Sequence, residues 1–457
     1  MADVLTRRKK TATRDMTEGS IVKQVILFSL PLMLGNAFQM LYNTVDSVVV
    51  GNFVGTQALA AVGSTTMIVN MLVFFFNGFS AGASVVISHL FGARQTDRLH
   101  LAIETAMLGT FLLSILLTVV GVLSVKPLLR LMDTPEDVFA EAVLYLRIYI
   151  AGISGLLIYN MGSGILRAVG DSTRPLYFLI MTSVLNTILD LLFVLVFHQG
   201  IAGVAYATII AQFVSAILTL LLLSCTKDVY RLTWSDLRID WTILRQVVGL
   251  GLPTGLQAII TSISNIFVQS YINAFGSSCM AGWSSFSKLD QFCMLPMQSL
   301  TTAATTFVGQ NVGAMKYKRA DHGTANIMLI AVCVEAVLAA VLFLCAPFAL
   351  GLFSKDAAVL GFGVLFLRMN IFFQPVNSVS HIYAGALRGW GNTRGPTAIL
   401  LGSLVVVRQI YLYLITNFVA NTPVSVCIGF PVGWTACCVA MLIYYSFWRK
   451  RKSISAA

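Results

Sequence analysis

Two stretches of the chain, GILRAVGDSTRP at residues 164–175 and GALRGWGNTRGP at residues 385–396, are copies of one motif, 221 residues apart. The same leucine, arginine, glycine and proline recur in both copies. The same offset aligns FGARQTDR (91–98) with VGAMKYKR (312–319). A repeat of this length predicts that the chain consists of two halves with similar folds.

The composition places both halves in a membrane. The chain is 57% hydrophobic and only 11% charged, with a mean hydropathy of +0.83, whereas soluble domains carry roughly 25% charged residues. A spanning helix needs about 20 mostly apolar residues. We count twelve such stretches and find no alternating strand pattern of the kind that barrels need. We therefore expect an all-α integral membrane protein with twelve transmembrane helices in two pseudo-symmetric six-helix bundles around a central cleft.

The expected organisation follows from these stretches and from the basic segment between the halves. It comprises a cytoplasmic N-terminal segment, the N-terminal bundle, a linker, the C-terminal bundle and a basic cytoplasmic tail, at residues 1–20, 21–225, 226–246, 247–446 and 447–457 respectively. The linker TKDVYRLTWSDLRIDWTILRQ is basic and amphipathic, so we expect it on the cytoplasmic membrane surface.

The positive charge follows the topology. The net charge is +11, and 23 of the 30 Lys and Arg residues fall in the N-terminal segment, at the start of the first span (Lys23), in alternate loops, in the linker and in the tail. This positive-inside pattern predicts a multi-pass protein of the inner (plasma) membrane with both termini in the cytoplasm, and it argues against nucleic-acid binding. The start of the chain is too polar for a cleaved signal peptide. The eight cysteines show no CxxC spacing and indicate neither disulfides nor a metal site.

Acidic residues inside the apolar stretches are the main functional candidates, because a charge near the bilayer centre costs about 2.5–3.5 kcal/mol on insertion scales. Asp46 shares a helical face with Asn43 and Gln39, and Asp190 follows Asn186 by one helical turn. The repeat-related positions of the second half carry no acid. We therefore interpret both acids as functional; the alternative is that they only hold neighbouring helices together.

Other polar positions define a possible substrate cleft. Its candidates are Gln39 and Asn43 with Gln257, Lys288 and Asp290. Glu335 is the only acid in its span, and a ligand contact, a hydrogen-bonded position and a lipid-edge position all stay open for it.

The sequence shows no Walker A motif, no HExxH motif and no nucleophile elbow. We expect no catalytic residues, no cofactor and no metal, and therefore no enzyme. Transport would draw on an ion gradient, or the protein would be a passive path.

The stretches SLPLMLGNAFQMLYNTVDSVVVG, LRAVGDSTRP, VGQNVGA and LRGWGNTRGP resemble the MATE family, the multidrug and toxic compound extrusion transporters. The resemblance extends from Glu18 to about Lys452, and the N-terminal half is similar to the DinF-type, proton-coupled branch. It implies a conformational hinge at Pro31. It also implies a cation-coupling network of Asp46, Asp190, Asn186, Tyr145, Asn160 and Thr208.

The resemblance further implies an antiporter that exports amphipathic, cationic drugs or metabolites by alternating access. Its coupling ion would be the proton, with sodium as the alternative, and its partners would be the small-molecule substrate and membrane lipid around a monomer. Two other functions stay open. A flippase for a lipid-linked precursor would need cavity cations such as Lys288 and Arg408, and an uncoupled channel or receptor would need no buried acids.

Overall fold

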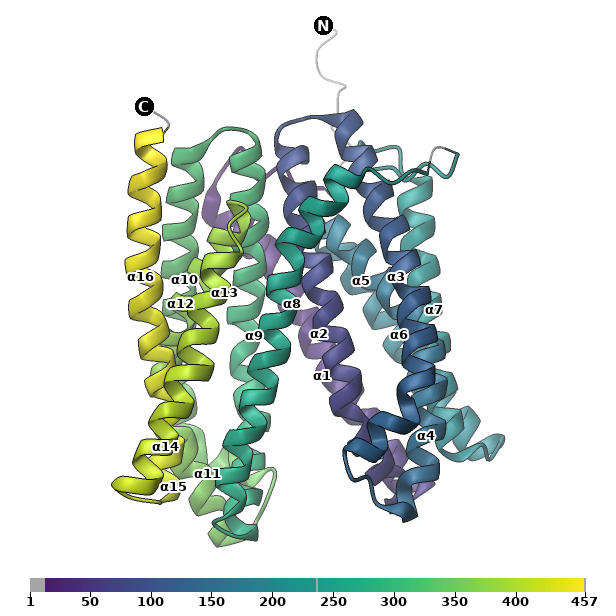
Figure 1. The fold of residues 1–457 in the computed structure, drawn as a ribbon, viewed down its shortest axis with the longest axis vertical. Coiled ribbons are helices and arrows are strands. Elements are labelled where there is room, and N and C mark those ends of the chain that lie inside the picture. The colour runs from purple at the N-terminus through teal and green to yellow at the C-terminus, as the bar shows by residue number, and fades with distance from the viewer. Residues whose placement is uncertain (1–12, 236, 456–457) are drawn as a thin grey trace, which may run out of the picture. The chain divides into compact units, whose positions relative to one another are not determined.

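The computed structural model describes residues 13–235 and 237–455. Residues 1–12 of the expected N-terminal segment and residues 456–457 of the expected tail therefore lie outside the described part. The described residues fold almost entirely into helices and contain no strand (Figure 1). The predicted all-α fold is confirmed.

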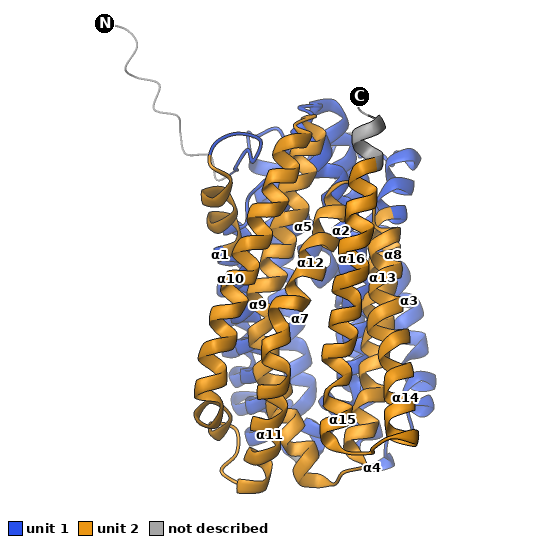
Figure 2. Cartoon of the chain, turned by 90° about the vertical axis from the view of Figure 1, so that its left-hand side faces the viewer, with its two compact units in different colours: residues 1–19, 30–249 blue, residues 20–29, 250–457 orange. Residues whose placement is uncertain are grey.

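The chain divides into two compact units (Figure 2). Unit 1 comprises residues 1–19 and 30–249, and unit 2 comprises residues 20–29 and 250–457. The helices from α1 to α7 are α1 Ile21–Val49, α2 Thr56–Gly92, α3 Thr96–Leu131, α4 Glu136–Ala151, α5 Ile153–Ala168, α6 Thr173–Leu191 and α7 Gly200–Cys225, with π-helical segments η1 Val50–Val54 after α1 and η2 Leu192–Val196 after α6.

Unit 2 repeats this order. Its helices are α8 Trp241–Asn273, α9 Ser277–Gly313, α10 Tyr317–Gly351, α11 Ala357–Asn370, α12 Gln374–Gly389, α13 Arg394–Leu401, α14 Arg408–Phe418, α15 Pro423–Cys427 and α16 Gly429–Ser455, with the short 3-10 segment η3 Ile371–Phe373 after α11 and the π-helical segment η4 Gly402–Val407 after α13.

The helices account for the predicted membrane spans. Ten helical stretches of the described chain are long and apolar enough to cross a membrane, and the pair α4–α5, bent by 46° at Gly152, makes an eleventh. A side chain at Gly152 would collide with Ile209 of α7, so the bend depends on close helix packing at this glycine. Helix α9 is as long as the others, but its many polar residues keep it out of the apolar set.

The backbone repeats at the offset seen in the sequence. Helices α2 and α9 begin and end 221 residues apart, as do α5 and α12. The Ser84 hydroxyl donates to the Gly164 carbonyl at 3.0 Å, and the Thr305 hydroxyl donates to the Gly385 carbonyl at the same distance. Positive φ angles recur at three related pairs of positions, Gly55 and Gly276, Arg94 and Met315, and Gly170 and Gly391. The prediction of two pseudo-symmetric halves is confirmed.

The motif at residues 164–175 forms the turn between α5 and α6. Gly170 has φ +87°, and a side chain there would collide with the Arg14 carbonyl oxygen, so glycine is required on both counts. Asp171 then caps α6, because its Oδ1 accepts the backbone N–H groups of Thr173 and Arg174 at 3.1 Å each. The presence of this turn in both halves serves the fold rather than the chemistry.

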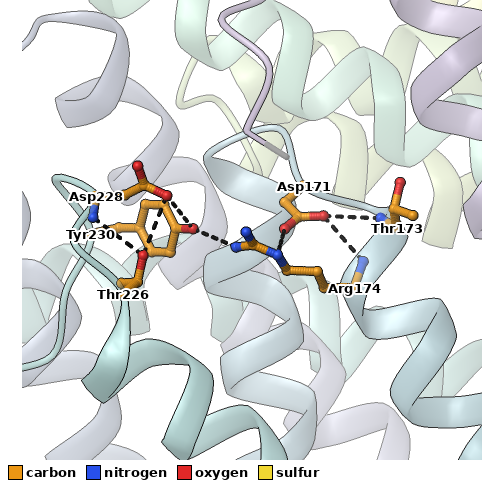
Figure 3. A network of polar contacts seen from close by, with 6 residues as sticks. All are labelled: Asp171, Thr173, Arg174, Thr226, Asp228 and Tyr230. Atoms are coloured by element: carbon orange, nitrogen blue, oxygen red, sulfur yellow. Dashed lines mark hydrogen bonds and ion pairs between the residues drawn. The ribbon is translucent and has the colours of Figure 1, made fainter. Parts of the chain in front are cut away.

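A polar network ties this turn to the segment that follows α7 (Figure 3). Arg174 Nε lies 3.4 Å from Asp171 Oδ2, and Arg174 Nη1 donates to the Tyr230 hydroxyl at 2.8 Å. Tyr230, which is fully buried, donates in turn to Asp228 at 3.0 Å.

The segment between the two units is attached to α3. The described residues 226–235 and 237–240 form no helix, and α8 begins at Trp241. Thr233 donates to Glu104 at 2.6 Å, and the Asp240 N–H donates to Thr105 at 3.0 Å. Much of the expected linker is therefore an irregular segment that is hydrogen-bonded to unit 1. Its position on the membrane surface stays a prediction.

Each unit pairs an arginine of an expected cytoplasmic segment with acids of the same unit. In unit 1, Arg94 of the α2–α3 loop pairs with Asp15 at 3.7 Å and with Glu18 at 3.8 Å. In unit 2, Arg449 near the end of α16 pairs with Asp321 of α10 at 3.1 Å. Both arginines lie in segments that the positive-inside pattern predicts to be cytoplasmic. The side of the membrane on which these segments lie stays a prediction.

Candidate cation-coupling site

Two carboxyl groups meet inside unit 1. Asp46 lies on α1, four residues before η1 begins, and Asp190 lies on α6, two residues before η2 begins. Asp190 is fully buried and Asp46 is partly buried. The two carboxyl groups interact electrostatically with each other.

Three of the four carboxyl oxygens of this pair lack a donor among the described residues. Within the described chain, neither oxygen of Asp190 nor Oδ1 of Asp46 receives a hydrogen bond, and the ion pairs of that part include no partner for either acid. Two adjacent carboxylates repel each other, whereas one shared proton gives both a partner. One proton shared between the two carboxyl groups would therefore stabilise the pair.

Tyrosines surround the pair. The electrostatic field of Asp46 reaches Tyr42, Tyr145 and Tyr149, and the rings of Tyr145 and Tyr149 stack with centroids 6.2 Å apart. Gln212 donates to the Tyr149 hydroxyl at 3.3 Å. Of these, only Tyr145 was predicted from the sequence.

The missed residues follow a simple spacing. Tyr42 precedes Asp46 by four residues, Tyr149 follows Tyr145 by four, and Gln212 follows Thr208 by four. Each is one helical turn from a predicted residue and therefore shares its face. That spacing is the signal that would have found them.

Unit 1 contains a cavity of about 120 Å³, and its lining includes Tyr42 and Asn186, each one helical turn before one of the two acids. Its lining includes Pro31, Gln39, Tyr42, Asn160, Asn186 and Thr208. Asn186 is 1% exposed, and neither its side-chain nitrogen nor its oxygen has a hydrogen-bond partner among the described residues. Because one water needs about 10–15 Å³, the cavity has room for several waters or for a small part of a ligand.

The predicted network thus divides into two parts. Asp46, Asp190 and Tyr145 form the acid cluster, whereas Asn160, Asn186 and Thr208 line the cavity. Thr208 also donates to the Val204 carbonyl of its own helix at 3.0 Å. Their roles in coupling stay predictions.

The remaining cleft candidates lie elsewhere. Asn43 is exposed on α1 and is not part of the cavity lining, although Gln39 of the same face is. In unit 2, Gln257 is partly buried, Lys288 is exposed with its ammonium 5.9 Å from the Phe353 ring, and Asp290 accepts a hydrogen bond from Gln374. Their part in substrate binding stays a prediction.

Helix irregularities adjoin the charged positions. The segments η1 and η2 follow Asp46 and Asp190, and η4 ends immediately before the buried Arg408. Short π-helical segments inside α-helices often mark functional sites. Three such segments next to three intramembrane charges indicate that helix geometry there is adapted to the charge.

Pro31 interrupts the hydrogen bonding of α1. It follows Leu27 by four residues, and it lacks the N–H that would bond the Leu27 carbonyl. The division of the chain between unit 2 and unit 1 falls at Ser29 and Leu30, immediately before this proline. A helix with a missing bond at such a boundary is suited to bending there.

Two repeated six-helix halves, a buried acid pair and an adjoining polar cavity define a membrane transporter rather than an enzyme. A protein-family model described as MatE matches this chain twice, at residues 31–192 and 253–414, once in each half. The chain belongs to the MatE family.

Individual proteins show the same similarity. The probable multidrug resistance protein YpnP of Bacillus subtilis (strain 168) is 31% identical, over 96% of this chain and 98% of its own length. The probable multidrug resistance protein YoeA of the same strain is 26% identical, over 98% and 99%. A solved structure of a multidrug resistance MATE family transporter of the MOP superfamily, in its outward-facing conformation, is similar with a TM-score of 0.89 and 25% identity, over 98% of this chain and 99% of that one.

Proposed function

We propose that the protein exports amphipathic, cationic drugs or metabolites from the cell in exchange for protons. The observation that carries the proposal is the Asp46–Asp190 pair, a buried proton acceptor without a cationic partner in the described chain. The names of the two Bacillus relatives, both probable multidrug resistance proteins, support drugs as the exported class.

The pair acts as the coupling element. A proton that enters from outside is favoured by about 2.3 kcal/mol per 100 mV of membrane potential. It removes the repulsion between Asp46 and Asp190 and lets the two helices that carry them approach. The missing bond at Pro31 allows α1 to bend in response, which reshapes the adjoining cavity and releases its contents. Loss of the proton to the cytoplasm restores the charged, receptive state.

The cavity suits a cation. Asn160, Asn186, Tyr42 and Tyr159 line it, and amide oxygens and aromatic rings are groups that attract positive charge. Arg167 is the only cationic residue among the described residues that line the cavity. A flippase for a pyrophosphate-linked lipid would need several cations, so nothing in this cavity favours that alternative.

Efflux of ethidium from energised vesicles tests the proposal. Proton and sodium gradients are imposed separately on vesicles that contain the wild type, Asp46→Asn, or Asp137→Asn as a control that removes an exposed acid of the same unit. We expect the proton gradient alone to drive export in the wild type and in the control, but not in Asp46→Asn. Export driven by sodium alone would replace the proton with sodium as the coupling ion, and export that ignores both gradients would refute the proposal.

A further inference from the structure

Unit 2 has a buried acid cluster of its own. Asp290 on α9 and Glu335 on α10 interact electrostatically with each other, and the thiol of Cys293 lies close to both. Glu335 is 1% exposed. This burial excludes the lipid-edge position that the sequence left open for Glu335, because the side chain points into the unit and not toward lipid.

Glu335 lacks the partners that a buried carboxylate requires. Neither of its oxygens has a hydrogen bond of good geometry within the described residues. The nearest backbone donor is Met297, which follows Pro296 inside α9. A carboxylate in such a place, with a second acid beside it, is strongly disfavoured, whereas a neutral carboxylic acid is tolerated.

Asp290 is supported differently. Gln374 of α12 donates to Asp290 Oδ1 at 2.6 Å, and Asn377 donates to the Gln374 amide oxygen at 3.4 Å. This amide chain stabilises a negative charge on Asp290. The two acids are therefore unequal, and Glu335 is the one whose charge nothing compensates.

The charged and titratable groups on the helices packed against α10 do not neutralise Glu335. On α11, the guanidinium of Arg368 lies over the Phe343 ring, 5.0 Å from the ring centroid. Phe343 belongs to α10 and follows Glu335 by eight residues. On α9, Lys288 lies over Phe353. Besides Asp290 and Cys293, the other such groups are Cys279 on α9, His381, Tyr383 and Arg388 on α12, and Tyr317, Lys318, Arg319, Asp321, His322, Cys333 and Cys345 on α10 itself. None of these forms an ion pair with Glu335 in the described part of the chain.

The cluster is not a copy of the acid pair in unit 1. The repeat-related positions of Asp290 and Glu335 are Val69 and Ser114, which carry no acid. The acids of unit 1 lie on α1 and α6, whereas those of unit 2 lie on the counterparts of α2 and α3. A scaffold role common to both halves therefore does not explain them.

We propose that Glu335, positioned beside Asp290, is a second proton-binding site, which takes up and releases a proton in the transport cycle. In the arrangement described here its carboxyl group is protonated. When the helices around it move and admit water, the proton passes to water, and the resulting carboxylate repels Asp290 until a proton returns. The transport part of this inference rests on the proposed proton-coupled export, but the protonation of Glu335 does not.

Infrared spectroscopy of the purified protein tests the protonation directly. A protonated buried carboxyl group gives a carbonyl stretching band that is distinct from carboxylate bands and shifts in D2O. We expect absorption of this kind in the wild type, the loss of one component of it in Glu335→Gln while the component of the Asp46–Asp190 pair stays, and full retention in Asp321→Asn, an α10 acid that is paired with Arg449. A spectrum that is identical in the wild type and in Glu335→Gln would overturn the proposal. Should the glutamine variant fail to fold, Glu335→Asp must move the band, and an unmoved band overturns the proposal equally.

Stoichiometry tests the role in transport. Protons taken up per ethidium exported are counted in liposomes with the wild type, Glu335→Gln and Asp321→Asn. We expect the ratio to fall by one in Glu335→Gln and to stay unchanged in Asp321→Asn; an unchanged ratio in Glu335→Gln overturns the proposal. Failure of the proposed function looks different, because wild-type export would then ignore the proton gradient altogether.

Discussion

Replacing Pro31 tests whether bending of α1 limits transport. Pro31→Ala supplies the missing N–H, which then bonds the Leu27 carbonyl within a continuous helix. Alanine is about 3 kcal/mol more favourable than proline inside a helix, and glycine is about 1 kcal/mol less favourable than alanine. At about 1.4 kcal/mol for each tenfold change in an equilibrium, Pro31→Ala shifts the balance toward a straight helix by about two orders of magnitude.

The assay is the initial rate of ethidium export from liposomes under an imposed proton gradient. We expect Pro31→Ala to export about 100-fold more slowly than the wild type, and Pro31→Gly to be slowed by about 30-fold because glycine leaves the helix weaker. Pro253→Ala makes the repeat-related change in α8, and it should leave the rate within about threefold, since α8 carries no acid, unlike α1 with Asp46.

Hydrogen exchange checks whether a new backbone hydrogen bond at position 31 causes the slower export of Pro31→Ala. A protected amide at position 31 of the alanine variant would establish that the new hydrogen bond forms. Wild-type export together with that protection would refute the hinge, since the helix would then be straightened without consequence.

Three further changes have defined outcomes. Gly170→Ala should lower the free energy of unfolding by at least about 2 kcal/mol, measured by thermal unfolding in detergent, because φ +87° disfavours alanine and its Cβ meets Arg14; an unchanged midpoint would show that the turn relaxes freely. Tyr230→Phe removes two hydrogen bonds of the network in Figure 3 and should cost about 1–3 kcal/mol in the same assay, whereas no loss would mean that water replaces the hydroxyl. Reporter fusions at the C-terminus should be active only in the cytoplasm, and an extracytoplasmic reporter would invert the predicted topology.

The fold was predictable because its signals are local. The glycine, acid or amide, and proline of the 164–175 motif specify a turn wherever they occur, so their recurrence at 385–396 exposes the duplication without any tertiary information. Helix α9 was also predicted, although its polarity sets it apart from the other spans. The attachment of the linker to α3 was not predictable, because Thr233 and Glu104 are 129 residues apart.

The site was predictable only in part. The cost of an intramembrane charge marks Asp46 and Asp190 as candidates from sequence alone, together with other charges in the spans such as Asp290 and Glu335. Whether Asp46 and Asp190 meet depends on how α1 and α6 pack. The contacts of Tyr149 and Gln212 also depend on helix packing, because spacing shows which helix face a residue shares but not whether that face is turned toward the acids. For Glu335 the sequence left the environment open, since one acid in an apolar span has no periodic partner that shows which way it points.

The number of protons taken up per exported ethidium, measured in the wild type and in Asp46→Asn under the same proton gradient, tests the central claim most directly. The amide that Asp46→Asn introduces keeps the shape and polarity of the carboxyl group but cannot exchange a proton, so we predict that gradient-driven export and its coupled proton uptake are both lost while folded protein stays in the membrane. Gradient-driven export by Asp46→Asn with the wild-type proton ratio would contradict the claim that the Asp46–Asp190 pair couples proton entry to export.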